Sequence, residues 1–180
     1  MRPAKFLLAL LLAFGLAAEA QAATLRIFSY DPANPQTRRL AGQLTFEFKQ
    51  RLIFTEVVRV RSTTGAASAA LKPAGEGELG VSLASLIGPN SGERDLYAID
   101  QADEGKDMIR AFCPGAAHGW LVFGRLRRDE PLRVHVLGDQ AGGGPARLCA
   151  TLDFQFRGEW RLPRTSPVKP PPPVINPLTN

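Results

Sequence analysis

The sequence predicts a mainly β protein: a six- to seven-stranded antiparallel sandwich or partly open barrel with one or two short helices. Short segments in which apolar and polar residues alternate recur along the chain, separated by clusters of glycine, proline and aspartate. Only one segment has a clear helical repeat. The alternative is a two-layer α+β arrangement in which that helix covers one face of the sheet. We expect a single domain over residues 24–162, because this length fits the usual one-domain range.

Three strands are expected in the first third of the domain. Residues 24–30 form the first, which ends at the two prolines of residues 31–35. Residues 44–49 alternate strictly, as expected for a strand with one buried and one wet face. Residues 52–61 form a longer third strand that places Val58 and Val60 on one face. A bulge is expected near residues 53–54, where the alternation breaks.

The middle of the chain carries mixed signals. Residues 65–71 fit one or two turns of helix that Pro73 ends, and the glycines that follow favour a loop. Residues 79–87 fit a strand or a helix equally well, so residues 62–90 stay undecided. Residues 96–100 form a short strand.

A helix is predicted to begin at Asp103 and to end before Cys113-Pro114-Gly115. Asp103 is a suitable N-cap, and Met108, Ile109 and Phe112 recur at helical spacing.

Three strands then form an antiparallel meander over residues 119–125, 132–137 and 147–156. In the last strand, Leu148 and Ala150 fall on the core face and Cys149 on the opposite face.

The N-terminus has the pattern of a signal peptide over residues 1–23. Arg2 and Lys5 precede an apolar run over residues 6–18, and Ala-Gln-Ala at residues 20–22 forms a small-x-small cleavage site. The run is shorter than the roughly 20 residues that a membrane-spanning helix needs. We therefore expect an exported protein, periplasmic or extracellular, with no transmembrane segment after cleavage.

The other end of the chain changes in composition. Residues 163–180 contain seven prolines and no apolar periodicity, which predicts a disordered, extended tail. The net charge of +5 falls to about +4 when the signal peptide is removed. This mild charge suits weak attraction to anionic envelope polymers. Nucleic acid is excluded as a partner because export separates the protein from it.

Cys113 and Cys149 are the only cysteines, and an even number in an exported protein predicts a disulfide. The bond would tether the end of the predicted helix to the last strand. A free nucleophilic thiol at Cys113, with His118 nearby in sequence, is the competing interpretation.

No catalytic, metal or cofactor site is predicted. The two histidines, His118 and His135, lack the companions and spacing of a metal site, and His135 is expected on a solvated strand face. The glycine-rich segment 138–144 lacks the order of a phosphate-binding loop and is expected to be a hairpin connection. No nucleophile-elbow motif is present.

Arginines alternate with apolar residues on several predicted strands, which suggests a basic sheet face for an anionic ligand. Such a face could bind an anionic envelope glycan, a lipid headgroup or another envelope protein, with Trp120 or Trp160 at its edge. The alternative, without a ligand, is that these charges only keep a sheet face soluble. The arginines of this hypothesis are Arg59, Arg61, Arg125, Arg133 and Arg157.

Residues 111–115, 132–139 and 156–160 resemble segments of small exported proteobacterial proteins for which no activity is established. The resemblance implies no functional residue. The leading functional hypothesis is therefore a non-enzymatic binding or accessory module of the cell envelope. The alternative is a secreted hydrolase whose catalytic groups meet only in the fold.

Overall fold

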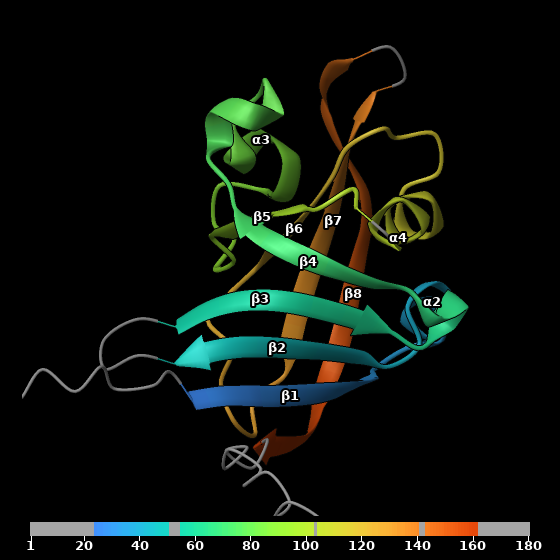
Figure 1. Cartoon of the computed structure of the whole chain (residues 1–180). Coiled ribbons are helices and arrows are strands. Elements are labelled where there is room, and N and C mark those ends of the chain that lie inside the picture. Colours follow the sequence, from blue (N-terminus) through green and yellow to red (C-terminus); the bar gives the residue numbers. More distant parts are fainter. Residues whose placement is uncertain (1–23, 51–54, 103, 141–142, 162–180) are drawn as a thin grey trace, which may run out of the picture.

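The protein is a closed antiparallel β-barrel in which each strand pairs with its neighbours in sequence and β1 pairs with β8 (Figure 1). The computed structural model describes residues 24–50, 55–102, 104–140 and 143–161. The mainly β fold is confirmed. The described residues form eight strands, not six or seven, and the barrel is fully closed. The strands are β1 (Thr24–Pro32), β2 (Leu44–Gln50), β3 (Thr55–Ser62), β4 (Ser68–Pro73), β5 (Asp95–Ile99), β6 (Gly119–Phe123), β7 (Leu132–Gln140) and β8 (Gly144–Arg161).

Short helices lie at the connections between strands. In α2, Pro35 occupies the first turn and the Asn34 side chain accepts a hydrogen bond from the Thr37 amide at 2.8 Å. The predicted helix before Cys113 is confirmed as α4, but its N-cap is Glu104 and not the predicted Asp103, which lies outside the described residues. The helical segments are α2 (Pro35–Leu40), η1 (Thr64–Ala66), η2 (Glu76–Leu79), α3 (Leu83–Ile87) and α4 (Gly105–Phe112).

The strand that the sequence left undecided is β4. Its residues pair with β3 at one end and with β5 at the other, and these two partners make a strand of an alanine-rich segment with little strand propensity. Residues 74–94, which include the end of the undecided region, leave the barrel and contain η2 and α3 (Figure 1).

Closure of the barrel depends on β8, which spans 18 residues. It pairs with β7 along its first part and with β1 along its second, as Figure 1 shows. Register shifts interrupt both ladders. Such bulges bend a strand, so that one long strand can pair with β7 along one part and with β1 along the other.

Two bulges change which residues face the core. In β3 the register shifts at Val58, so that Val57 and Val60 are buried and Val58 is only partly buried. The predicted pairing of Val58 with Val60 on one face is therefore wrong. In β8 the shift at Cys149 leaves Leu148 with 41% of its surface exposed, so its predicted place in the core is also wrong.

The barrel interior is filled with side chains, and aromatic rings dominate it. Phe46 lies 5.0 Å from Phe123 and 6.1 Å from Tyr30 between ring centroids, and Tyr97 stacks on Phe123 at 5.0 Å. Eight strands enclose a space just wide enough to be filled in this way. The Tyr30 hydroxyl has no hydrogen-bond partner among the described residues, and burial raises the pKa of this group.

A second apolar cluster lies outside the barrel, under residues 74–94. Leu79 and Leu83 of this excursion pack on Trp120, Val122 and Leu137, which are the outward-facing residues of β6 and β7. The excursion therefore shields from water a sheet face that would otherwise be exposed.

The two cysteines lie at disulfide distance, as predicted, with Cα atoms 5.3 Å apart. Cys113 follows α4 directly, and Cys149 occupies the bulge of β8. Gly138 of β7 makes room for the pair, because a Cβ atom there would lie 2.4 Å from the Cys113 Sγ. The crosslink tethers helix to sheet as the sequence suggested.

The predicted signal peptide (residues 1–23) and proline-rich tail (residues 163–180) lie outside the described residues. No helix in the described ranges is both long enough and apolar enough to cross a membrane.

Candidate binding site between β3 and β5

A pocket of about 310 Å³ opens in the barrel wall between β3 and β5. It exists because β4 leaves β3 after Ala70. Only Arg59, Val60 and Arg61 of β3 pair with β4, whereas the rest of β4 follows β5 as far as Pro73. Figure 1 shows β4 diverging from β3 toward the start of β3. The β3–β5 pocket is lined by Thr55, Val57, Asp95, Tyr97, Phe123, Arg125 and Leu126.

The wall of this pocket combines an aromatic surface with a few polar groups. Tyr97 and Phe123 are nearly parallel, with an interplanar angle of 5°. The backbone of Val57 faces the Tyr97 hydroxyl across the gap and acts to lower the pKa of that group. Burial and the nearby Asp95 nevertheless raise the pKa of Tyr97. An apolar surface with a small number of placed polar groups is typical of a ligand site.

Two opposite charges lie at the rim of the pocket. Asp95 begins β5, and Arg125 lies two residues beyond Phe123, with which Asp95 is in register. Neither side chain has an ion pair or a side-chain hydrogen bond with another described residue. Both charges are therefore available to a ligand.

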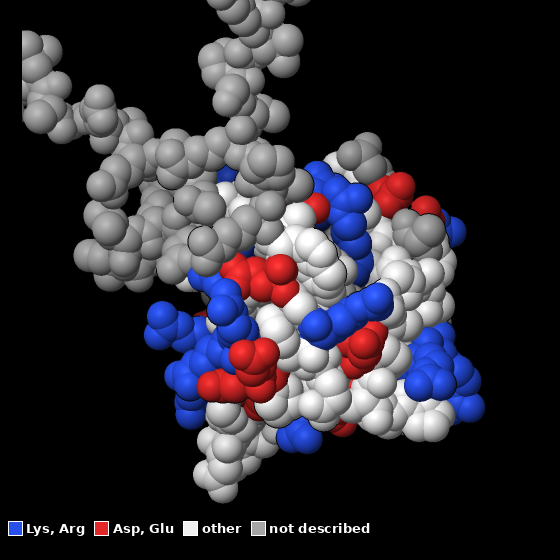
Figure 2. Space-filling model, turned by 90° about the horizontal axis from the view of Figure 1, so that it is seen from below, with Lys and Arg blue, Asp and Glu red and all other residues white. Residues whose placement is uncertain are grey.

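The five arginines of the predicted basic face do not share one face. Arg59 and Arg61 lie on β3, whereas Arg133 lies on β7, which is four strands away in either direction around the barrel. Figure 2 shows Lys and Arg side chains next to Asp and Glu side chains in several places. Within the described residues, Arg125 alone of the five has no hydrogen bond or ion pair.

The other four arginines have protein partners. Arg61 contacts Glu47 at 2.9 Å, Arg133 contacts Asp153 at 2.8 Å, and Arg157 contacts Asp31 at 3.4 Å. Arg59 donates to the Ser68 hydroxyl at 3.0 Å. These contacts join neighbouring strands on the outside of the barrel.

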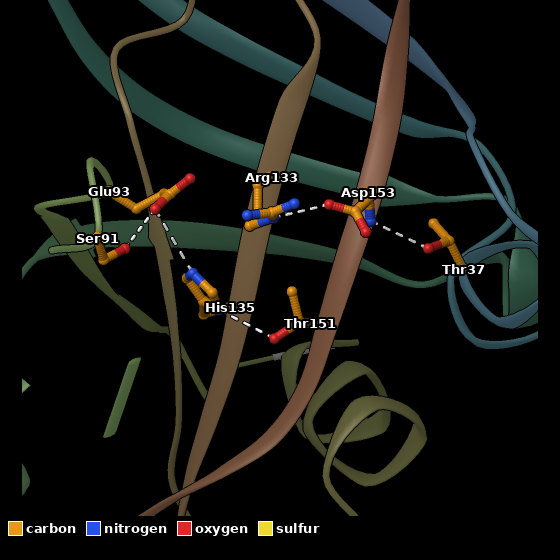
Figure 3. A network of polar contacts seen from close by, with 7 residues as sticks. All are labelled: Thr37, Ser91, Glu93, Arg133, His135, Thr151 and Asp153. Carbon is orange, nitrogen blue, oxygen red and sulfur yellow. Dashed lines mark hydrogen bonds and ion pairs between the residues drawn. The ribbon is translucent and has the colours of Figure 1, made fainter. Parts of the chain in front are cut away.

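A polar network covers the outer face of β7 and β8 (Figure 3). His135 Nδ1 lies 3.0 Å from the Thr151 hydroxyl, and its Nε2 lies 3.6 Å from a Glu93 carboxylate oxygen. Ser91 donates to Glu93. His135 was expected on a solvated face, yet only 6% of its surface is exposed, because the segment carrying Ser91 and Glu93 covers it.

This environment favours the neutral form of His135. Burial lowers the pKa of His135 from its ordinary value of 6.5, although the Glu93 carboxylate opposes the shift. For Glu93, burial acts to raise the pKa, but the hydrogen bonds from Ser91 and its own backbone and the charges of His135 and Arg133 lower it overall.

We expect the free energy of unfolding to decrease as the pH falls below about 6.5. The unfolded chain takes up a proton at His135 in that range, whereas the folded protein resists it because the imidazole is buried. Urea unfolding at a series of pH values measures this effect. In His135→Gln the same decrease should be smaller. An identical pH dependence in the variant and the parent would contradict the assignment to His135.

A second imidazole–carboxylate contact lies beside the crosslink. Asp139 accepts hydrogen bonds from the amides of Ala117 and His118 and lies 2.7 Å from His118 Nδ1. Burial acts to raise the pKa of Asp139, but these hydrogen bonds have the larger, opposite effect. The pKa is therefore below its ordinary value, and the carboxylate stays ionised. The contact secures the loop that enters β6.

The described residues hold no group of three or more metal-ligating side chains. No described cysteine is free, so the nucleophilic-thiol interpretation of Cys113 finds no support in this structure.

Comparisons of the chain with models of protein families, with curated proteins and with solved structures give no match. The function of this chain is therefore inferred from its own geometry and chemistry.

Proposed function

We propose that this protein is an exported, non-enzymatic binding protein, periplasmic or extracellular, that holds one small ligand in the β3–β5 pocket. The single observation that carries the proposal is the pairing of the Tyr97–Phe123 surface with Arg125 in one pocket. A planar or apolar part of the ligand lies against the rings, and an anionic group contacts the guanidinium.

This proposal keeps the anionic ligand expected from the arginines but moves its site. Arg59, Arg61, Arg133 and Arg157 already have partners, so a ligand would have to displace protein contacts on the barrel surface. Arg125 offers its charge without that cost. Envelope glycans and lipid headgroups remain candidate sources of the anionic group.

We do not propose a hydrolase. The hydroxyl of Ser91 donates a hydrogen bond to Glu93, and the segment that carries these two residues covers the imidazole of His135. The remaining described histidine contact, His118 with Asp139, has no hydroxyl or thiol partner among the described residues.

The proposal is tested with the aromatic sulfonate 8-anilinonaphthalene-1-sulfonate, which combines a planar apolar body with one negative charge. We expect its fluorescence to rise saturably at one site per protein. Arg125→Gln should weaken this binding by about tenfold or more, since a hydrogen bond to a charged group contributes about 1.5–3 kcal/mol.

The matched control is Arg133→Gln, which removes an exposed guanidinium of β7 that is paired with Asp153 and does not line the pocket. It should leave binding of the sulfonate unchanged. Near-UV circular dichroism confirms that both variants are folded. Equal affinity in the Arg125 and Arg133 variants, or no saturable binding at all, would refute the proposal.

A further inference from the structure

The first half of β3 has a free edge. Thr55, Glu56 and Val57 pair with β2 on one side, but the pairing with β4 begins only at Arg59. On the β4 side, the part of the chain that the structure describes supplies no strand partner for residues 55–58. Unpaired N–H and C=O groups on a strand edge are a template for another strand.

This edge faces the β3–β5 pocket. Val57 and Tyr97 both line the pocket, and the Val57 backbone faces the Tyr97 hydroxyl. Backbone groups alternate in direction along a strand, so the N–H and C=O of Thr55 and the C=O of Val57 point the same way. Three backbone groups beside the pocket therefore have room for a partner.

The position of Arg125 indicates the direction in which a chain would lie. A strand antiparallel to β3 runs in the same direction as β4, so its carboxyl end comes to the Thr55 end of the gap. Arg125 lies at that end, because β5 begins there with Asp95 and Arg125 extends two residues beyond the partner of Asp95.

We propose that the β3–β5 pocket binds the C-terminal end of an extended peptide, which adds to the free edge of β3 as a short strand. The terminal carboxylate contacts Arg125, and the last side chain lies on Tyr97 and Phe123. This inference rests on the proposed function and names the class of its ligand. Strand addition with pockets for alternate side chains is an established mode of peptide recognition.

Asp95 contributes selectivity to this site. A ligand with one carboxylate places it on Arg125 and keeps the rest of its surface neutral, whereas a polyanion would bring a second negative charge toward Asp95. The free edge covers about four residues, or roughly 13 Å of extended chain. A segment of three or four residues therefore fills the site.

The test uses a fluorescein-labelled tetrapeptide, Gly-Val-Val-Phe, with a free C-terminal carboxylate, and its C-terminal amide. Fluorescence anisotropy should show the carboxylate form binding about tenfold or more tightly than the amide. Arg125→Gln should abolish this difference. Methylation of the two valine nitrogens should weaken binding by about tenfold, because it removes strand hydrogen bonds.

A pair of protein variants isolates the strand edge. Thr55→Pro and Thr55→Val both change a side chain that lines the pocket, but only the proline variant removes the backbone N–H of residue 55. Thr55→Pro should therefore bind the peptide less tightly than Thr55→Val, whereas the two variants should bind the aromatic sulfonate equally. If the sulfonate binds but the carboxylate, amide and N-methylated peptides bind equally, the peptide inference fails and the proposed function stands. If the sulfonate also fails to bind at the pocket, the proposed function fails too.

Discussion

Replacing both Cys113 and Cys149 with serine is expected to lower the free energy of unfolding by about 4 kcal/mol. The crosslink joins residues separated by 36 positions, so its loss releases a long loop in the unfolded chain. For a domain of this size the melting temperature should fall by about 10 °C. Denaturant unfolding of the oxidised parent and the double variant measures the difference.

Reduction of the parent protein serves as the control for the cysteine variant. Dithiothreitol should bring the parent close to the stability of the double variant. Ligand binding at the β3–β5 pocket should survive in both, because the cysteines do not line that pocket. Titration that finds two free thiols in denatured protein exported without reductant would contradict the crosslink.

Phe46→Ala is expected to destabilise the barrel by about 3–5 kcal/mol. Phe46 is fully buried and lies between Tyr30 and Phe123, so its removal leaves a cavity that the rigid barrel wall cannot close. Differential scanning calorimetry or urea unfolding measures the loss. The control is Leu148→Ala, which removes a large apolar side chain that is 41% exposed at the β8 bulge. Its cost should be less than about 1 kcal/mol. A comparable cost for the two variants would show that Leu148 belongs to the core.

Local patterns predicted most of the strands well. The alternation in β2, the helical spacing of Met108, Ile109 and Phe112, and the apolar segments β6 and β7 are all properties of consecutive residues. The same patterns failed where pairing between distant segments decides the outcome. β4 became a strand because β3 and β5 pair with it, and bulges opposite β2 and β7 reversed the faces of Val58 and Leu148.

The candidate site was harder to predict for the same reason. Tyr97 and Phe123 have the sequence context of ordinary core residues, and they do pack on the core. The pocket beside them forms because β4 leaves β3 after Ala70 and follows β5 as far as Pro73. Arg125 was one of five arginines with similar spacing, and only the closed barrel reveals that the other four have partners.

Closure of the barrel by β8 has a consequence for how the chain folds. The contact between Arg26 of β1 and Glu159 of β8 joins residues 133 positions apart, so the loss of loop entropy precedes any gain from this ladder. Folding dominated by such distant pairing takes milliseconds to seconds. The first seven strands cannot close the barrel until β8 pairs with both β7 and β1. Cys149 lies on that same strand, so closure of the barrel and the contact between the two cysteines both need β8 in place.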